Sequence, residues 1–203
     1  LITSRIEHHA VLHTAEALSR EYGVRVEYLP LDANGNPEMH ALEDLLQSDD
    51  SGKLVTLMHV NNEIGNLLDM EAVGTLCREH GALFHSDTVQ SIGHFRWDLQ
   101  KTPVDFLNAA AHKFHGPKGI GFAYIRKDTG LKPLILGGSQ ERGYRAGTEP
   151  YHNIIGLETA FLEAYEHLDR EKAYVTGLKE YFMKGLRKAI PGVVFNRLSG
   201  DVD

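Results

Sequence analysis

Lys113 has an unusual chemical setting. It follows a run of small and apolar residues, DFLNAAA, and precedes a turn-rich segment, HGPKGIG. A lysine at the end of a buried strand is either structural, with its ammonium group reaching out to water, or a reactive amine. Partial burial lowers the pKa of an amine towards neutrality, and the neutral amine is both a nucleophile and a base. The pattern therefore favours a Schiff-base lysine.

A carboxylate in a comparable position makes this interpretation more specific. Asp87 ends the apolar segment ALFHSD. Taken alone it is equally well interpreted as an exposed or helix-capping aspartate. A carbonyl cofactor such as pyridoxal phosphate needs a lysine for its aldehyde and a carboxylate for its ring nitrogen. Lys113 and Asp87 together predict a pyridoxal phosphate site.

Two glycine-rich segments are candidates for anion binding. HGPKGIG lacks the spacing of a phosphate-binding loop or a dinucleotide fingerprint, so we interpret it as a plain turn. GGSQERGYRAGTEP exposes backbone donors and adds Arg142, Arg145 and Thr148, which suit an anion. The alternative for this second segment is a solvated basic loop.

Histidine and cysteine are less informative. The twelve histidines include no group of three at metal-ligand spacing, so no metal site built by the protein is predicted. The single cysteine, Cys77, shares one helical face with Met70 and Val73. We therefore expect Cys77 to pack in the core rather than to act as a nucleophile.

The elements that position these residues alternate between strand and helix. This order predicts an α/β fold with a largely parallel sheet. We expect strands within 1–4, 24–31, 53–60, 82–91, 104–114 and 119–126, and helices within 8–23, 34–48, 70–81 and from 153 onwards. Gly23 and Gly81 are placed to end helices, and Asp69 to begin one.

Polar side chains follow three of the expected strands. They are Asn61 and Asn62, Asp87 and Gln90, and His112 and Lys113. Ligands of open α/β sheets bind outside the carboxyl ends of the strands. We therefore expect an amide, a carboxylate and an amine to meet in one crevice.

Composition excludes several classes of protein. Of the 203 residues, 42% are hydrophobic and 24% charged, which is ordinary for a globular domain. The net charge of -7 argues against nucleic acid or an anionic membrane as the main partner. One cysteine excludes an internal disulfide framework and favours the cytoplasm. The chain starts without Met in a strand-like run and stops after another, so we expect a fragment.

Five segments, in order, resemble a known family. IEHHAVL, MHVNNEIG, HSDTVQSIG, AHKFHGPKGIG and ERGYRAGT are similar to segments of cysteine desulfurases, the NifS/IscS-like branch of the class V aminotransferases. The resemblance implies the large domain of a fold type I pyridoxal-phosphate-dependent transferase, with a mainly parallel sheet flanked by helices and truncated at both ends. Residues 1–190 would form this cofactor-binding domain, and 191–203 would start a small C-terminal domain.

The resemblance also implies roles for three residues at the centre of the site. Lys113 would form the Schiff base with pyridoxal phosphate, and Asp87 would pair with the pyridinium nitrogen. His8 would stack on the cofactor ring and move protons during the reaction. Lys113 and His8 are thus the expected catalytic residues.

Four further residues are expected around the cofactor. Asn62 would orient the substrate carboxylate or the ring oxygen, and Gln90 would bond the phenolic oxygen. His112 would contribute at the phosphate. Thr148 would reach the phosphate in a partner subunit, which implies a homodimer with shared sites.

The implied reaction takes sulfur from L-cysteine, leaves L-alanine, and forms an enzyme persulfide. A scaffold or carrier protein would accept that sulfur for iron–sulfur cluster assembly. Ala110 stands where the family usually has a serine that donates to the phosphate. The family's N-terminal phosphate loop, substrate-binding arginine and persulfide cysteine have no counterpart here. The alternatives are a selenocysteine lyase, another class V aminotransferase, and a non-catalytic folded fragment or binding module.

Overall fold

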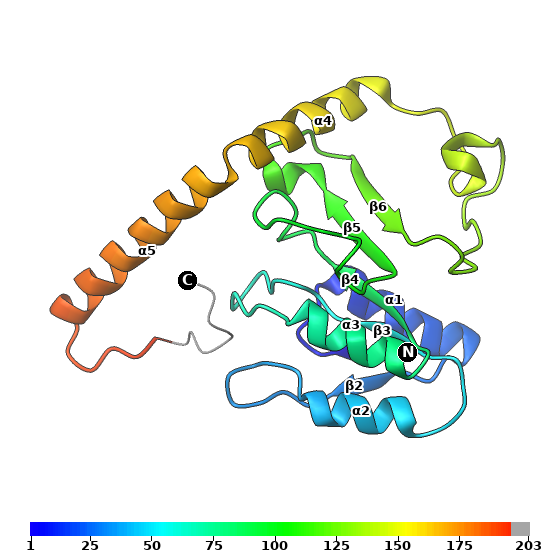
Figure 1. Cartoon of the computed structure of the whole chain (residues 1–203), viewed down its shortest axis with the longest axis horizontal. Coiled ribbons are helices and arrows are strands. Elements are labelled where there is room, and N and C mark those ends of the chain that lie inside the picture. Colours follow the sequence, from blue (N-terminus) through cyan, green and yellow to red (C-terminus); the bar gives the residue numbers. More distant parts are fainter. Residues whose placement is uncertain (196–203) are drawn as a thin grey trace.

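A single twisted sheet organises the chain. The computed structural model describes residues 1–195. Its six strands lie in the order β2-β1-β3-β4-β5-β6 (Figure 1). They are β1 (Ile2–Ser4), β2 (Glu27–Leu29), β3 (Leu54–Thr56), β4 (Leu83–Asp87), β5 (Phe106–Ala110) and β6 (Gly121–Ile125). The first five run parallel and β6 runs antiparallel to β5, which confirms the predicted mainly parallel α/β architecture.

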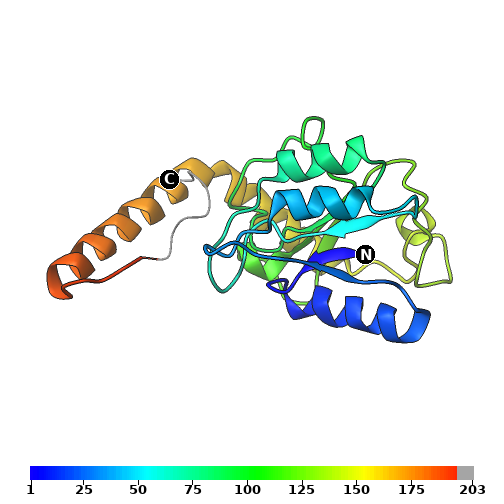
Figure 2. The same ribbon diagram turned by 90° about the horizontal axis from the view of Figure 1, so that it is seen from below.

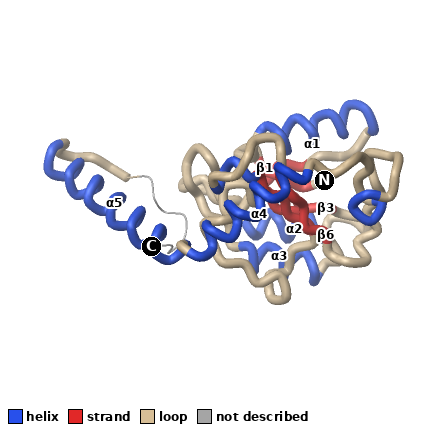
Figure 3. The backbone as a smooth tube through the Cα atoms, turned by 90° about the horizontal axis from the view of Figure 1, so that it is seen from above, coloured by secondary structure: helices blue, strands red, loops and turns tan. Residues whose placement is uncertain are grey.

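Helices cover both faces of this sheet. Figure 2 shows α1 on one face and α2 and α3 on the other. The helices are α1 (His9–Tyr22), α2 (Met39–Gln47), α3 (Met70–Glu79), α4 (Tyr151–Glu166) and α5 (Leu168–Ala189), with short 3-10 turns η1 (Ala111–Phe114) and η2 (Gln140–Gly143). α5 extends away from the body (Figures 1 and 3).

The helix ends follow from local sequence. His8 caps α1, its Nδ1 accepting from Ala10 N at 3.2 Å, and Gly23 closes the helix at φ 68°. Asp69 Oδ1 accepts from Ala72 N at 2.9 Å and so caps α3. Gly81, at φ 66°, follows the end of α3. The predicted helix signals at Gly23, Asp69 and Gly81 are confirmed.

The core lies between the sheet and its helices. Phe84, Phe114 and Leu42 are among the largest fully buried side chains. Cys77 is 1% exposed and packs in this core, as its helical face predicts. Burial, with the nearby Asp105 charge, raises the pKa of the Cys77 thiol to about 12.

The structure departs from the sequence pattern in the last third. The single helical pattern expected from residue 153 is two helices, which meet at His167. Most of 191–203, the expected start of a second domain, lies outside the described residues, and 191–195 form no helix or strand. Within residues 1–195, no helix has the length and apolar character needed to cross a membrane.

Candidate active site

The carboxyl ends of β4 and β5 bring Asp87 close to the segment that carries Lys113. Asp87 is the last residue of β4 and pairs with Asn108 of β5. The chain leaves β5 directly into η1, which contains Lys113. Since both strands run in one direction, the two residues share one edge of the sheet.

The Asp87 carboxylate is buried, 5% exposed, and is hydrogen-bonded through one of its two oxygens. Its Oδ1 accepts from Val89 N at 3.0 Å and from Asn108 Nδ2 at 3.2 Å. Among the described residues, Oδ2 accepts no hydrogen bond. The backbone is fixed too, because Asp87 O accepts from His59 N at 3.0 Å. One carboxylate oxygen is therefore left for a donor from outside these residues.

Lys113 is exposed in this chain, in contrast to the partial burial that its sequence setting indicates. The reason is the 3-10 turn η1, in which the neighbouring residue Phe114 packs into the core, 1% exposed, while Lys113 faces outward. The Lys113 amine is thus open to a ligand, and the backbone beneath it is anchored by Phe114 in the core.

A close backbone approach holds η1 against the turn after β4. A Cβ added to Gly93 would lie 2.7 Å from Phe114 Cβ, and Gly93 has φ 85°. His94 Nε2 lies 3.3 Å from Lys113 O. This turn also contains Gln90, half-buried and only three residues beyond Asp87. Gln90 is therefore on the same edge of the sheet as Asp87.

The loops after β1 and β3 join the same edge. Asn61 is buried; its Nδ2 donates to Ile6 O at 2.6 Å, which links the two loops. Asn62 is exposed, and its Nδ2 donates to Glu63 Oε1 at 2.8 Å. His8 is exposed at the start of α1, and its ring is held by the capping bond.

The remaining two predicted residues are placed differently from each other. His112 is exposed in η1, beside Lys113. Thr148 is exposed in the long connection from β6 to α4, which Figure 1 shows beyond β6. Because β6 is antiparallel, this connection leaves from the opposite edge of the sheet, where Ile125 pairs with Phe106.

Two further residues at this edge escaped the sequence analysis. Asn108 interrupts the apolar strand β5 and contacts Asp87. Glu7 follows β1 and is 5% exposed; Ser4 Oγ donates to its Oε1 at 2.7 Å, and its Oε2 has no partner among the described residues. Burial raises the pKa of Glu7 to about 7. A polar residue within or just after a buried strand was the available signal.

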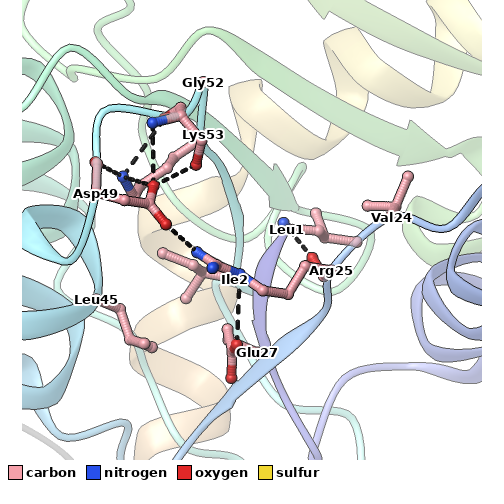
Figure 4. A pocket seen from close by; sticks show the side chains of 10 residues that line it. Leu1, Ile2, Val24, Arg25, Glu27, Leu45, Asp49, Gly52 and Lys53 are labelled. Carbon is pink, nitrogen blue, oxygen red and sulfur yellow. Dashed lines mark hydrogen bonds and ion pairs between the residues drawn. The ribbon is translucent and has the colours of Figure 1, made fainter.

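A charged pocket lies elsewhere in the fold. A pocket of about 330 Å³ is lined by Leu1, Arg25, Glu27, Asp49 and Lys53 (Figure 4). Arg25 and Lys53 pair with Asp49 at 2.7 and 3.0 Å. Leu1 and Lys53 directly precede β1 and β3, so this pocket is at the amino ends of the strands. Its charges are mutually paired, and it is separate from the site.

A protein-family match covers almost the whole chain. Residues 1–200 match the aminotransferase class-V family. This chain belongs to the class-V aminotransferases. The resemblance found in the five sequence segments is thereby confirmed.

Two curated relatives of this class-V aminotransferase chain are both named cysteine desulfurases. It is 41% identical over 196 residues to the cysteine desulfurase IscS of Clostridium botulinum (strain Kyoto / Type A2), covering 97% of this chain and 49% of the relative. It is 45% identical over 186 residues to the cysteine desulfurase IscS of Pseudomonas putida (strain GB-1), covering 91% and 45%. The chain thus spans about half the length of the curated relatives it matches.

Solved structures agree with the fold. A NifS-like protein superposes with a TM-score of 0.86 at 40% identity, over 92% of this chain and 51% of that one. A NifS-like protein from Rickettsia africae ESF-5 gives a TM-score of 0.88 at 28% identity, over 98% and 54%. The class-V aminotransferase chain therefore has the architecture of these NifS-like proteins.

Proposed function

We propose that this chain is the cofactor-binding part of a pyridoxal-phosphate-dependent cysteine desulfurase that acts as a homodimer in the cytoplasm. The observation that carries the proposal is Asp87, buried at the end of β4 with one carboxylate oxygen left, on the same edge as Lys113. The curated relatives named cysteine desulfurases support the choice of reaction.

The donor set fits pyridoxal phosphate. Asp87 Oδ2 would accept from the protonated ring nitrogen, and the exposed Lys113 amine would hold the aldehyde carbon. Gln90, Asn62 and His8 would surround the ring, and His112 the phosphate. Thr148, exposed in the connection from β6 to α4, would serve a second subunit. The bound cofactor would act as an electron sink for negative charge at the substrate Cα.

The protein's own groups then have distinct tasks. Asp87 would keep the ring nitrogen charged, because a buried carboxylate stabilises a nearby cation. Lys113 would be the base that removes and returns the proton at the substrate Cα. His8, exposed at the start of α1, would exchange protons with the substrate.

Sulfur transfer needs a thiol outside the core. L-cysteine and an enzyme thiol would give L-alanine and an enzyme persulfide, so the sulfur atom moves without any external oxidant. Cys77, the one cysteine of this sequence, is 1% exposed with a thiol pKa raised to about 12. The thiolate is the nucleophile. We therefore assign the transfer to a cysteine beyond these 203 residues, and its acceptor to a scaffold or carrier protein for iron–sulfur cluster assembly.

The test uses the full native protein with L-cysteine, pyridoxal phosphate and a reducing thiol. Equal amounts of L-alanine and sulfide are expected. Lys113→Ala should lower alanine formation by about 10²–10⁴, the usual contribution of a catalytic acid–base group. Lys118→Ala, an exposed lysine in the following turn, is the matched control and should keep the activity. Alanine formation that survives Lys113→Ala contradicts the assignment, and turnover of selenocysteine alone indicates a selenocysteine lyase.

A further inference from the structure

A continuous hydrogen-bonded chain of side chains crosses three neighbouring strands and ends at Asp87. Thr56 Oγ1 lies 2.7 Å from His85 Nδ1. His85 Nε2 lies 2.9 Å from Asn108 Oδ1. Asn108 Nδ2 donates to Asp87 Oδ1 at 3.2 Å. We call Thr56, His85, Asn108 and Asp87 the strand relay. Only its last member has a role in the proposed function.

The carboxylate of Asp87, at the end of the strand relay, determines where the protons of the other members lie. An ionised carboxylate only accepts hydrogen bonds, so the Asn108 amide must turn its Nδ2 to Asp87. The Asn108 Oδ1 then faces His85, and His85 Nε2 must carry the ring proton. His85 Nδ1 is left as an acceptor, and the Thr56 hydroxyl donates to it. Burial lowers the pKa of His85, which keeps its ring neutral at pH 7.

The strand relay also fixes the direction of the Asp87 carboxylate. Asn108 Nδ2 and Val89 N both donate to Oδ1, at 3.2 and 3.0 Å. The Asn108 backbone is anchored in turn, because Thr88 Oγ1 donates to Asn108 O at 2.6 Å. With Oδ1 occupied from two sides, the carboxylate cannot turn without breaking both bonds. Oδ2 is the oxygen that remains for a ligand.

We propose that Asn108 and His85 are positioning residues, which hold the Asp87 carboxylate so that Oδ2 receives the protonated nitrogen of a pyridine-type ring. The proposal rests on the proposed function for the identity of that ring. It extends that function by assigning a role to two side chains that never touch the ligand.

A first experiment tests the strand relay without any cofactor. Histidine carrying a nitrogen isotope label is incorporated into the full native protein, and the His85 ring signals are assigned by their loss in His85→Gln. At pH 7 we expect a neutral ring with the proton on Nε2. A proton on Nδ1, or an imidazolium ring, overturns the proposal whatever the cofactor is.

A second experiment separates positioning from a purely structural role. The probes are pyridoxine phosphate, which lacks the aldehyde, and its analogue with the ring nitrogen replaced by carbon. Asn108→Ala should weaken the binding of pyridoxine phosphate about tenfold, which is the effect of one hydrogen bond to a charged group. The binding of the carbon analogue should not change. Asn34→Ala, which removes an exposed amide from a turn, is the control and should change neither affinity.

The outcomes of this second experiment are distinct. Equal weakening of both probes by Asn108→Ala means that the residue acts on the fold and not through Asp87, and overturns the proposal. If the unchanged protein binds neither probe, the proposed function fails and so does the role toward a ring nitrogen. The His85 proton position still decides whether the strand relay exists.

Discussion

Glu7 is a buried carboxyl group whose ionisation should control stability. It is 5% exposed, and burial raises its pKa from 4.5 to about 7, helped by the charge of Asp87 and opposed by the hydrogen bond from Ser4. The folded protein thus binds this proton more tightly than the unfolded chain does. The resulting stability is complete below about pH 4.5 and is lost as pH rises to about 7.

Glu7→Gln removes this dependence on pH. The amide keeps the size of the side chain and cannot ionise, so the free energy of unfolding of the variant relative to the original should rise by about 3 kcal/mol between pH 4.5 and 7.5. Urea unfolding of both proteins at several pH values measures this difference. Glu16→Gln, an exposed glutamate on α1, is the control. Parallel pH curves for Glu7→Gln and the original protein would show that Glu7 ionises normally.

At the scale of elements, the contact between η1 and the turn after β4 determines where Lys113 stands. Gly93→Ala would place a methyl group 2.7 Å from Phe114 Cβ and would strain a backbone at φ 85°. Strain of about 1–2 kcal/mol and overpacking of about 1–3 kcal/mol are expected together. We expect a loss of stability of that summed size and weaker binding of pyridoxal phosphate, because η1 must move and carries Lys113 with it.

A second glycine, Gly119, separates the effect of the Phe114 contact from the effect of backbone strain. Gly119 has φ 83°, and a Cβ there meets nothing within 4 Å. Gly119→Ala should therefore cost only the strain and leave cofactor affinity unchanged. Thermal unfolding and cofactor titration of both variants in the full native protein measure the two effects. Equal losses of stability and affinity in the two variants would show that the approach of Gly93 to Phe114 does not position η1.

Elements with strong local signals were predictable from sequence. Cap and stop residues, Asp69 and Gly23 among them, specify α1 and α3 by bonds within a few residues. The break at His167 was not predictable, because the apolar pattern continues through it. Lys113 and Asp87 stood out because each is charged at the end of an apolar run. The role of Asn108 depends on which strand lies beside β5, and that is a property of the sheet and not of the local sequence.

At the scale of the whole molecule, the described chain lacks an accessible thiol. Residues 1–203 incubated with L-cysteine and pyridoxal phosphate should gain no persulfide, because Cys77 is 1% exposed and its thiol pKa is raised to about 12. Mass spectrometry of the intact chain checks this. Alkylation of Cys77 after unfolding is the control that the thiol is present and reactive. A stable increase by the mass of one sulfur atom on Cys77 contradicts both its burial and the assignment of transfer to another cysteine.

The strand relay has a consequence for how the strands align during folding. β4 has buried residues on both faces, Phe84 and Ser86 on one and Asp87 on the other, so an apolar pattern alone specifies its register weakly. Slipping β4 by one residue would send His85 and Asp87 to the opposite face and bring Phe84 or Ser86 into their places. The buried Thr56 and the half-buried Asn108 would then lose these partners, at about 1–3 kcal/mol for each group left unsatisfied. Polar side chains in an otherwise apolar sheet thus exclude misaligned pairings that the hydrophobic residues would tolerate.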